Sequence, residues 1–186
     1  MDTVELRAQL AQAHALSYGW ALSCCAREPA EAADVLQTAY LKILDGRARY
    51  DGRASFKTWL FAVIRNTAAD ERRRHWLRRL RLTGYSDERA HDTQPATHSQ
   101  RLEQSELLQE FQAALAELPR RQQEVLHLVF YQDLSVQEAA DVLGVSVGSA
   151  RTHYERGKQR LREWLKQSRH FHEYQWDREQ IPAALS

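Results

Sequence analysis

Polar side chains of the kinds that bind nucleic acid gather on one short stretch in the second half of the chain. These candidates are Ser149, Arg151, Thr152, His153 and Arg156. An Arg guanidinium can donate two hydrogen bonds to the edge of a guanine, and Ser and Thr hydroxyls can contact bases or phosphates. The chemistry that these residues offer is therefore recognition of duplex DNA, with no bond made or broken.

Two short helices are predicted to position these side chains. Ser135 precedes Glu138 by three residues, a capping box that begins the first helix. Gly144 would end that helix, because glycine readily takes the positive φ of a sharp turn. Ser146 can cap the second helix, whose inner face is expected to contain Val147, Ala150, Tyr154 and Leu161. Two helices joined by such a turn are typical of a helix-turn-helix. The alternative is an ordinary helical hairpin with a solvated outer face.

A long basic helix is predicted in the first half of the chain. Two Asp-Gly pairs interrupt residues 45–55, which indicates a loop, and Ser55 fits the N-cap of a helix that begins at Phe56. Its buried stripe is expected to contain Trp59, Leu60, Val63 and Ile64, so that Trp59 is interpreted as a core residue. Its far end carries Arg72, Arg73, Arg74, Arg78, Arg79 and Arg81. Such a helix can hold a DNA strand by its phosphates.

The chain is predicted to be all-α, with two small helical domains joined by a flexible linker. Only 7 Gly and 4 Pro among 186 residues leave few places for hairpin turns. The expected parts are domains at 1–82 and 107–166, a polar linker at 83–106 and a tail at 167–186. Bases outnumber acids by 13 to 9 in residues 1–80, whereas acids outnumber bases by 6 to 2 in residues 82–110. This uneven distribution favours a nucleic-acid binder.

No motif typical of an enzyme occurs in the sequence. It contains no phosphate-binding loop, nucleophile elbow, zinc-ligand set or catalytic pair of acids, so we expect no enzymatic activity, no cofactor and no metal. Cys24 and Cys25 are neighbours, which would strain a mutual disulfide and favours a reduced, cytoplasmic protein. We expect these thiols to be buried and inert, with redox sensing as the alternative. No signal peptide or membrane-spanning run is expected.

Three groups of residues together resemble the extracytoplasmic-function (ECF) RNA polymerase sigma factors. Residues 32–42, AADVLQTAYLK, are similar to the region 2.2 helix of that family. Residues 50–60, YDGRASFKTWL, with the basic helix that follows, are similar to regions 2.3 and 2.4. Residues 118–126, LPRRQQEVL, and the helix-turn-helix resemble regions 4.1 and 4.2. The order and spacing of these motifs match the family, and the linker is too short for a region 3 domain.

The resemblance implies a transcription initiation factor that binds core RNA polymerase, recognises −35 and −10 promoter elements and promotes promoter melting. The −35 element would be read by Ser149, Arg151, Thr152, His153 and Arg156. The −10 element would be held by Tyr50, Arg53, Lys57, Arg65, Asn66, Arg72, Arg73 and Arg74. The polymerase clamp coiled coil would be contacted by Asp34, Gln37, Thr38 and Leu41. The helix at 126–131 would approach the polymerase flap.

Some positions depart from the family pattern. Ala33 and Thr38 stand where Glu is common, so that Asp34 is the nearby acid and polymerase affinity is expected to be low. One hypothesis is that a Thr kinase restores negative charge by phosphorylating Thr38, which would add about −1.5 to −2. The alternative is that Thr38 is a tolerated surface residue. An anti-sigma factor and the C-terminal tail are further candidates for control. His153 replaces a common basic residue, and Gly157 is expected to cost the second helix about 1 kcal/mol relative to Ala.

A helix-turn-helix regulator that does not recruit polymerase is the alternative function. The basic helix from Phe56 argues against it, because a repressor needs no block that separates strands.

Overall fold

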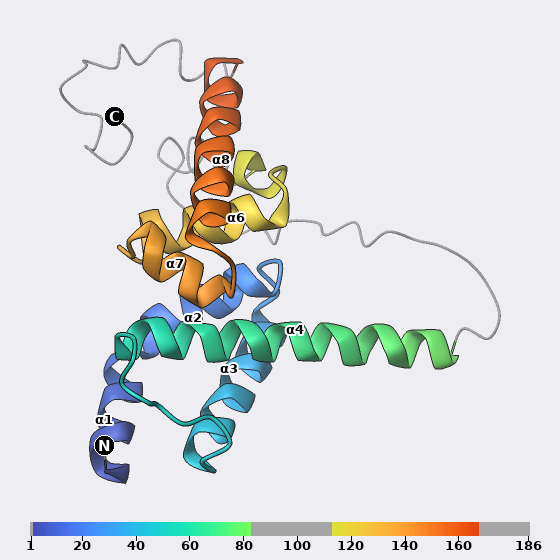
Figure 1. The fold of residues 1–186 in the computed structure, drawn as a ribbon. Helices are drawn as coiled ribbons and strands as arrows, with labels where there is room; N and C mark the ends of the chain where they lie inside the picture. The colour runs from blue at the N-terminus through green and yellow to red at the C-terminus, as the bar shows by residue number, and fades with distance from the viewer. Residues whose placement is uncertain (1, 83–112, 168–186) are drawn as a thin grey trace, which may run out of the picture. The chain divides into compact units, whose positions relative to one another are not determined.

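The computed structural model describes residues 2–82 and 113–167, which fall in two compact units. All regular elements in these residues are helices, as the all-α prediction requires. The first unit contains α1 (Thr3–Gln12), α2 (His14–Cys24), α3 (Pro29–Leu44) and α4 (Phe56–Leu82) (Figure 1). The second contains α6 (Arg120–Leu126), the π-helical turn η1 (His127–Tyr131), α7 (Val136–Leu143) and α8 (Val147–Gln167). The predicted linker and nearly all of the predicted tail lie outside the described residues. None of the helices described is long and apolar enough to cross a membrane.

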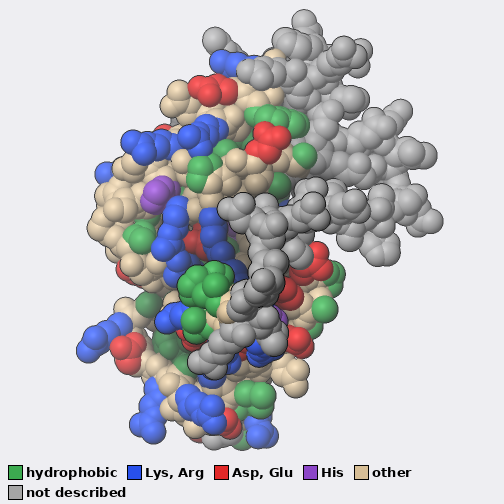
Figure 2. All heavy atoms as spheres, turned by 90° about the vertical axis from the view of Figure 1, so that its right-hand side faces the viewer, with side chains coloured by type: hydrophobic (Ala, Val, Ile, Leu, Met, Phe, Trp, Pro, Cys, Tyr) green, Lys and Arg blue, Asp and Glu red, His purple; other side chains and the backbone are tan. Residues whose placement is uncertain are grey.

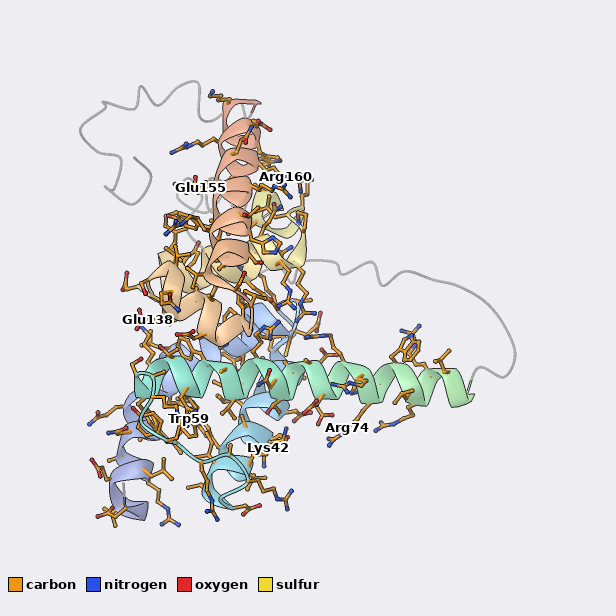
Figure 3. The ribbon with its side chains drawn as sticks, viewed as in Figure 1. Lys42, Trp59, Arg74, Glu138, Glu155 and Arg160 are labelled. Carbon is orange, nitrogen blue, oxygen red and sulfur yellow. The ribbon has the colours of Figure 1, made fainter. Side chains whose placement is uncertain are left out.

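Helix α4 packs against both α2 and α3, which also pack against each other. Polar contacts reinforce this packing from each side. From α2, the buried indole of Trp20 donates its Nε1–H to the carbonyl of Phe61 at 3.0 Å. From α3, the ammonium of Lys42 lies 3.2 Å from the Thr67 hydroxyl and 3.4 Å from the Asp70 carboxylate (Figure 3).

The loop before α4 follows the sequence expectation. Gly46 and Gly52 have φ of +71° and +76°, conformations that glycine adopts without strain, and they close the two Asp-Gly turns. The Ser55 hydroxyl accepts the Thr58 N–H at 3.1 Å, which confirms Ser55 as the N-cap. The last turns of α4 continue past α2 and α3 and project from the unit (Figure 1).

The interpretation of Trp59 as a core residue is wrong. The fully buried face of α4 is formed by Leu60, Phe61 and Ile64, each 0% exposed, whereas Trp59 is half-buried. Leu60 and Ile64 of the predicted stripe are thus confirmed as buried, whereas Val63 is half-buried and Phe61 was omitted. Trp59 instead packs against Tyr50 of the preceding loop.

The helix-turn-helix forms as predicted. The Ser135 N–H donates to the Glu138 carboxylate at 2.9 Å and the Glu138 N–H donates to the Ser135 hydroxyl at 3.2 Å, which confirms the capping box. Gly144 ends α7 with φ of +61°, and Ser146 caps α8 by accepting the Ser149 N–H at 3.1 Å. Each helix thus has its own N-cap, and the Val145 N–H closes the turn between them by donating to the Ala140 carbonyl at 3.1 Å.

Helix α8 packs closely against α6 at Gly157. A Cβ placed on Gly157 would lie 2.9 Å from Leu126 Cδ1 and 3.3 Å from Gln122 Cβ. Carbon atoms prefer separations of about 3.5–4.0 Å, so this position has no room for a side chain. The expected helix-propensity cost of Gly157 therefore accompanies a close approach of two helices. The predicted inner face is confirmed at Ala150, Tyr154 and Leu161, which are buried.

Candidate nucleic-acid interface

The first half of α8 presents the predicted DNA-reading residues on its outer surface. Ser149, Arg151, Thr152 and Arg156 are exposed and His153 is half-buried. The two hydroxyls make bonds within the helix: Ser149 Oγ lies 2.9 Å from Ser146 Oγ, and Thr152 Oγ1 donates to the Gly148 carbonyl at 2.9 Å. The two guanidiniums are consequently the groups on this surface best suited to reach a base edge.

A buried lysine, Lys158, lies on the inner face of α8. Lys158 is 8% exposed, and its ammonium lies 4.6 Å from the ring centre of Tyr154 and 3.4 Å from the Glu155 carboxylate. Tyr154 in turn packs on Phe130 of η1, with ring centres 5.8 Å apart. Burial raises the pKa of Tyr154, and the Glu155 charge adds to the increase. Sequence reasoning missed Lys158; its spacing of four from Tyr154, which places both on the inner face, is the signal that could have found it.

The predicted polymerase-binding residues share one face of α3. Asp34, Gln37 and Leu41 are exposed and Thr38 is half-buried, while Val35 on the other side is buried. Because a helix advances about 100° per residue, the four fall within one narrow arc. Leu41 is 52% exposed, so these four residues combine an exposed apolar side chain with the carboxylate of Asp34. Such a combination suits a protein partner.

An aromatic cluster closes the loop that precedes α4. The ring centres of Tyr50, Phe56 and Trp59 lie 5.3–5.7 Å apart, and the Tyr50 hydroxyl donates to the Ala54 carbonyl at 2.7 Å. Trp59 lies at the loop end of α4 (Figure 3). The sequence contained a signal for this cluster, because Phe56 and Trp59 are three residues apart on a helix. Tyr50 is therefore half-buried and held in place by the fold.

The other predicted −10 residues are spread around α4 and its loop. Arg53 is exposed and pairs with Asp51 at 3.3 Å. Lys57 lies over the Phe61 ring at 5.9 Å, and both it and Arg65 are half-buried beside the core. Asn66 is exposed on a different side of the helix. The structure thus places these residues on one element, although they do not share one face.

The three consecutive arginines of α4 have different surroundings. Arg72 donates from Nη1 to the Cys24 carbonyl at 2.8 Å and so binds α4 to the C-terminal end of α2. Arg73 and Arg74 are exposed and pair with Asp70 and Glu71 on their own helix. Exposed pairs of this spacing contribute little stability, so these two cations can exchange an acid for a phosphate at small cost.

Two family models, for two regions of sigma-70, match this chain. Sigma-70 region 2 matches residues 10–78, and Sigma-70, region 4 matches residues 108–161. The chain is 34% identical over 137 residues to the ECF RNA polymerase sigma factor SigX of Bacillus subtilis (strain 168), covering 71% of this chain and 69% of that one. It is 30% identical over 139 residues to the RNA polymerase sigma factor CarQ of Myxococcus xanthus, covering 75% and 77%.

A solved structure shows the same fold. The sigma factor RpoE of Bartonella quintana, determined in complex with the anti-sigma factor NepR, superposes with a TM-score of 0.68 at 23% identity. That match covers 89% of this chain and 99% of RpoE. Two helical units of the predicted kinds, with both region matches in the predicted order, agree with the sequence resemblance and exclude a regulator that lacks a polymerase-binding domain. The chain belongs to the ECF family of RNA polymerase sigma factors and is a transcription initiation factor.

Proposed function

We propose that the exposed side of α8 reads the −35 element through Arg151 and Arg156, with Ser149, Thr152 and His153 beside them. The observation that carries this assignment is the tight turn before α8: Gly144 ends α7 with φ of +61°, the Val145 N–H donates to the Ala140 carbonyl at 3.1 Å, and the Ser146 cap begins α8. A recognition helix places its N-terminal residues against base edges in the major groove. Arg151 lies in the first turns of α8 and is exposed, so it is the residue assigned to a guanine.

The loop and α4 of the first unit would hold the −10 element. Opening a promoter extracts bases from the stack at a cost of a few kcal/mol, which contacts to the unpaired strand must offset. The aromatic cluster offers flat apolar surface, and Arg53, Arg73 and Arg74 are exposed cations beside it or farther along α4. Lys57, Arg65 and Asn66 would complete the contact. For Tyr50 and Arg72, the hydrogen bonds to Ala54 and Cys24 indicate that their first role is to fix the loop and the helix.

The exposed face of α3 would dock on the clamp of core RNA polymerase in the cytoplasm, and η1 on the flap. Leu41 would supply the apolar contact and Asp34 the nearby charge. Because Asp34 is the one acid among the four proposed contact residues, docking would be weak until charge is added at Thr38 or an inhibitor is released. An anti-sigma factor is a reasonable inhibitor, since the Bartonella quintana relative binds one. The protein would act without catalysing a reaction.

A selection experiment tests the assignment of α8. Holoenzyme made from core polymerase and either wild type or Arg151→Ala would select promoters from a pool randomised around −35. Removing one bidentate guanine contact should relax preference at one position by about 1–3 kcal/mol. Gln159→Ala is the matched control, because Gln159 is exposed on the same helix but bonds to Glu163. Unchanged base preference in Arg151→Ala would contradict the assignment.

A further inference from the structure

The projecting end of α4 carries an apolar patch that no role described so far uses. Trp76 is 61% exposed, Leu80 50% and Leu77 42%. Trp76 and Leu80 are four residues apart and so lie one turn apart on the same side of the helix, with Leu77 beside them. A large indole exposed to this extent, next to two leucines, is unusual for a surface that contacts only water.

Basic side chains border this patch. Arg73 and Arg79 each lie three residues from Trp76, which makes them its neighbours on the helix surface. Arg73 is 69% exposed, and its ion pair with Asp70 lies on the same helix. In Figure 2, which looks onto this end of α4, green apolar side chains lie among blue basic ones. The surface is therefore complementary to a partner that is both anionic and flat-faced.

Single-stranded nucleic acid has this combination of properties. Its phosphates are negative, and each unpaired base has a π-face that can stack on an aromatic ring. Duplex DNA offers phosphates but hides its base faces within the stack, so it would use the arginines and leave the indole without a partner. Initiation exposes unpaired strands beside the helix that is proposed to hold the −10 element.

We propose that Trp76 is a stacking platform for an unpaired base of the opened promoter, with Arg73 and Arg79 on the adjoining phosphates. This inference rests on the proposed role of α4 in holding the melted −10 region and extends that role from Arg73 and Arg74 toward the C-terminal end of the helix. Leu77 and Leu80 contact the sugar and base edge next to the stacked base. The platform holds strand that has already opened and reads no sequence, because every base has a π-face.

The test uses holoenzyme assembled from core polymerase and the full chain, as wild type, Trp76→Ala or Trp76→Phe. One probe is a fluorescent duplex with an unpaired central segment, and a matched probe has the same segment without bases. Trp76→Ala should bind the base-containing bubble roughly 5- to 100-fold more weakly, the range expected of one base–aromatic stack. On the base-free bubble, Trp76→Ala should bind with the same affinity as wild type. Trp76→Phe should retain most of the affinity, since its ring can still stack.

The matched control is Val4→Ala, which removes an exposed apolar side chain, 78% exposed, from α1. Equal losses on both probes would show phosphate contact alone and overturn the stacking role. A loss of affinity for core polymerase would mean that the patch docks on protein instead. No change in any measurement would also refute the inference. If wild-type holoenzyme fails to prefer a bubble to a duplex, the proposed −10 role itself fails, whatever Trp76 does.

Discussion

Replacing Gly157 with alanine should destabilise the second unit, although helix propensity favours the change. Gly157 lies inside α8, where alanine is better than glycine by about 1 kcal/mol. The new methyl group would, however, lie 2.9 Å from Leu126 Cδ1 and 3.3 Å from Gln122 Cβ. The sign of the effect depends on whether α6 can move away at low cost.

Leu126 has little room to yield. It is 1% exposed, so its methyl cannot swing into solvent, and its Cγ is also within 3.3 Å of the added atom. Gln122 is 5% exposed and is approached at its Cβ, close to the backbone. Overpacking of this kind costs about 1–3 kcal/mol, which equals or exceeds the propensity gain. The net loss should be about 1 kcal/mol, and no more than about 2.

Hydrogen exchange is the appropriate assay, because it separates the second unit from the first. Amides of α6 and α8 should exchange about fivefold faster in Gly157→Ala, while those of α2 and α4 should not change. Gly148→Ala is the matched control on the same helix: its Cβ would meet only Ser146 Oγ, at 4.0 Å, so exchange should slow or stay equal. If Gly157→Ala protects α8 as Gly148→Ala does, the steric reasoning is refuted.

Two further predictions concern the first unit. Arg72→Ala removes the hydrogen bond to the Cys24 carbonyl and should cost about 1–2 kcal/mol, seen as faster exchange in α2. Arg78→Ala, at an exposed position, should stay within about 0.5 kcal/mol, and similar losses in both variants would contradict the anchoring role. Thr38→Asp should raise affinity for core polymerase about two- to fivefold over Thr38→Ala, as one added surface charge allows, in a titration at low salt. Equal affinities of the two variants would exclude charge control at this site.

The parts of the fold that local chemistry determines could be predicted from the sequence. Ser55, the Ser135–Glu138 box and Gly144 each satisfy or terminate backbone groups within a few residues, so their roles follow from neighbours in sequence. The error at Trp59 arose because its burial depends on contacts between helices that are distant in the sequence. Trp59 and Phe61 are both aromatic, and which of them is buried depends on α2, because the Trp20 ring centre lies 6.1 Å from the Phe61 ring centre.

Contacts between helices also limit how much of the candidate site could be predicted from the sequence. The exposed face of α3 follows from helical periodicity, and the structure brings its four residues to one side of that helix, while Arg151 and Arg156 of α8 are both exposed. Periodicity could not show that Arg72 turns toward Cys24, or that Lys158 is buried over Tyr154, because both depend on contacts between elements. An arginine or lysine in a basic run has the same sequence signal whether it binds DNA or the protein itself.

The most direct test of the central claim is to map transcription start sites by sequencing. Core RNA polymerase would be combined with this protein and a library of genomic fragments, with core alone as the control. An ECF sigma factor that reads −35 and −10 elements should produce starts at discrete positions that share two upstream motifs at a fixed spacing. Phospho-mimicking Thr38→Asp should increase their number without moving them. Starts no more specific than those of core alone, with wild type and with Thr38→Asp, would contradict the account.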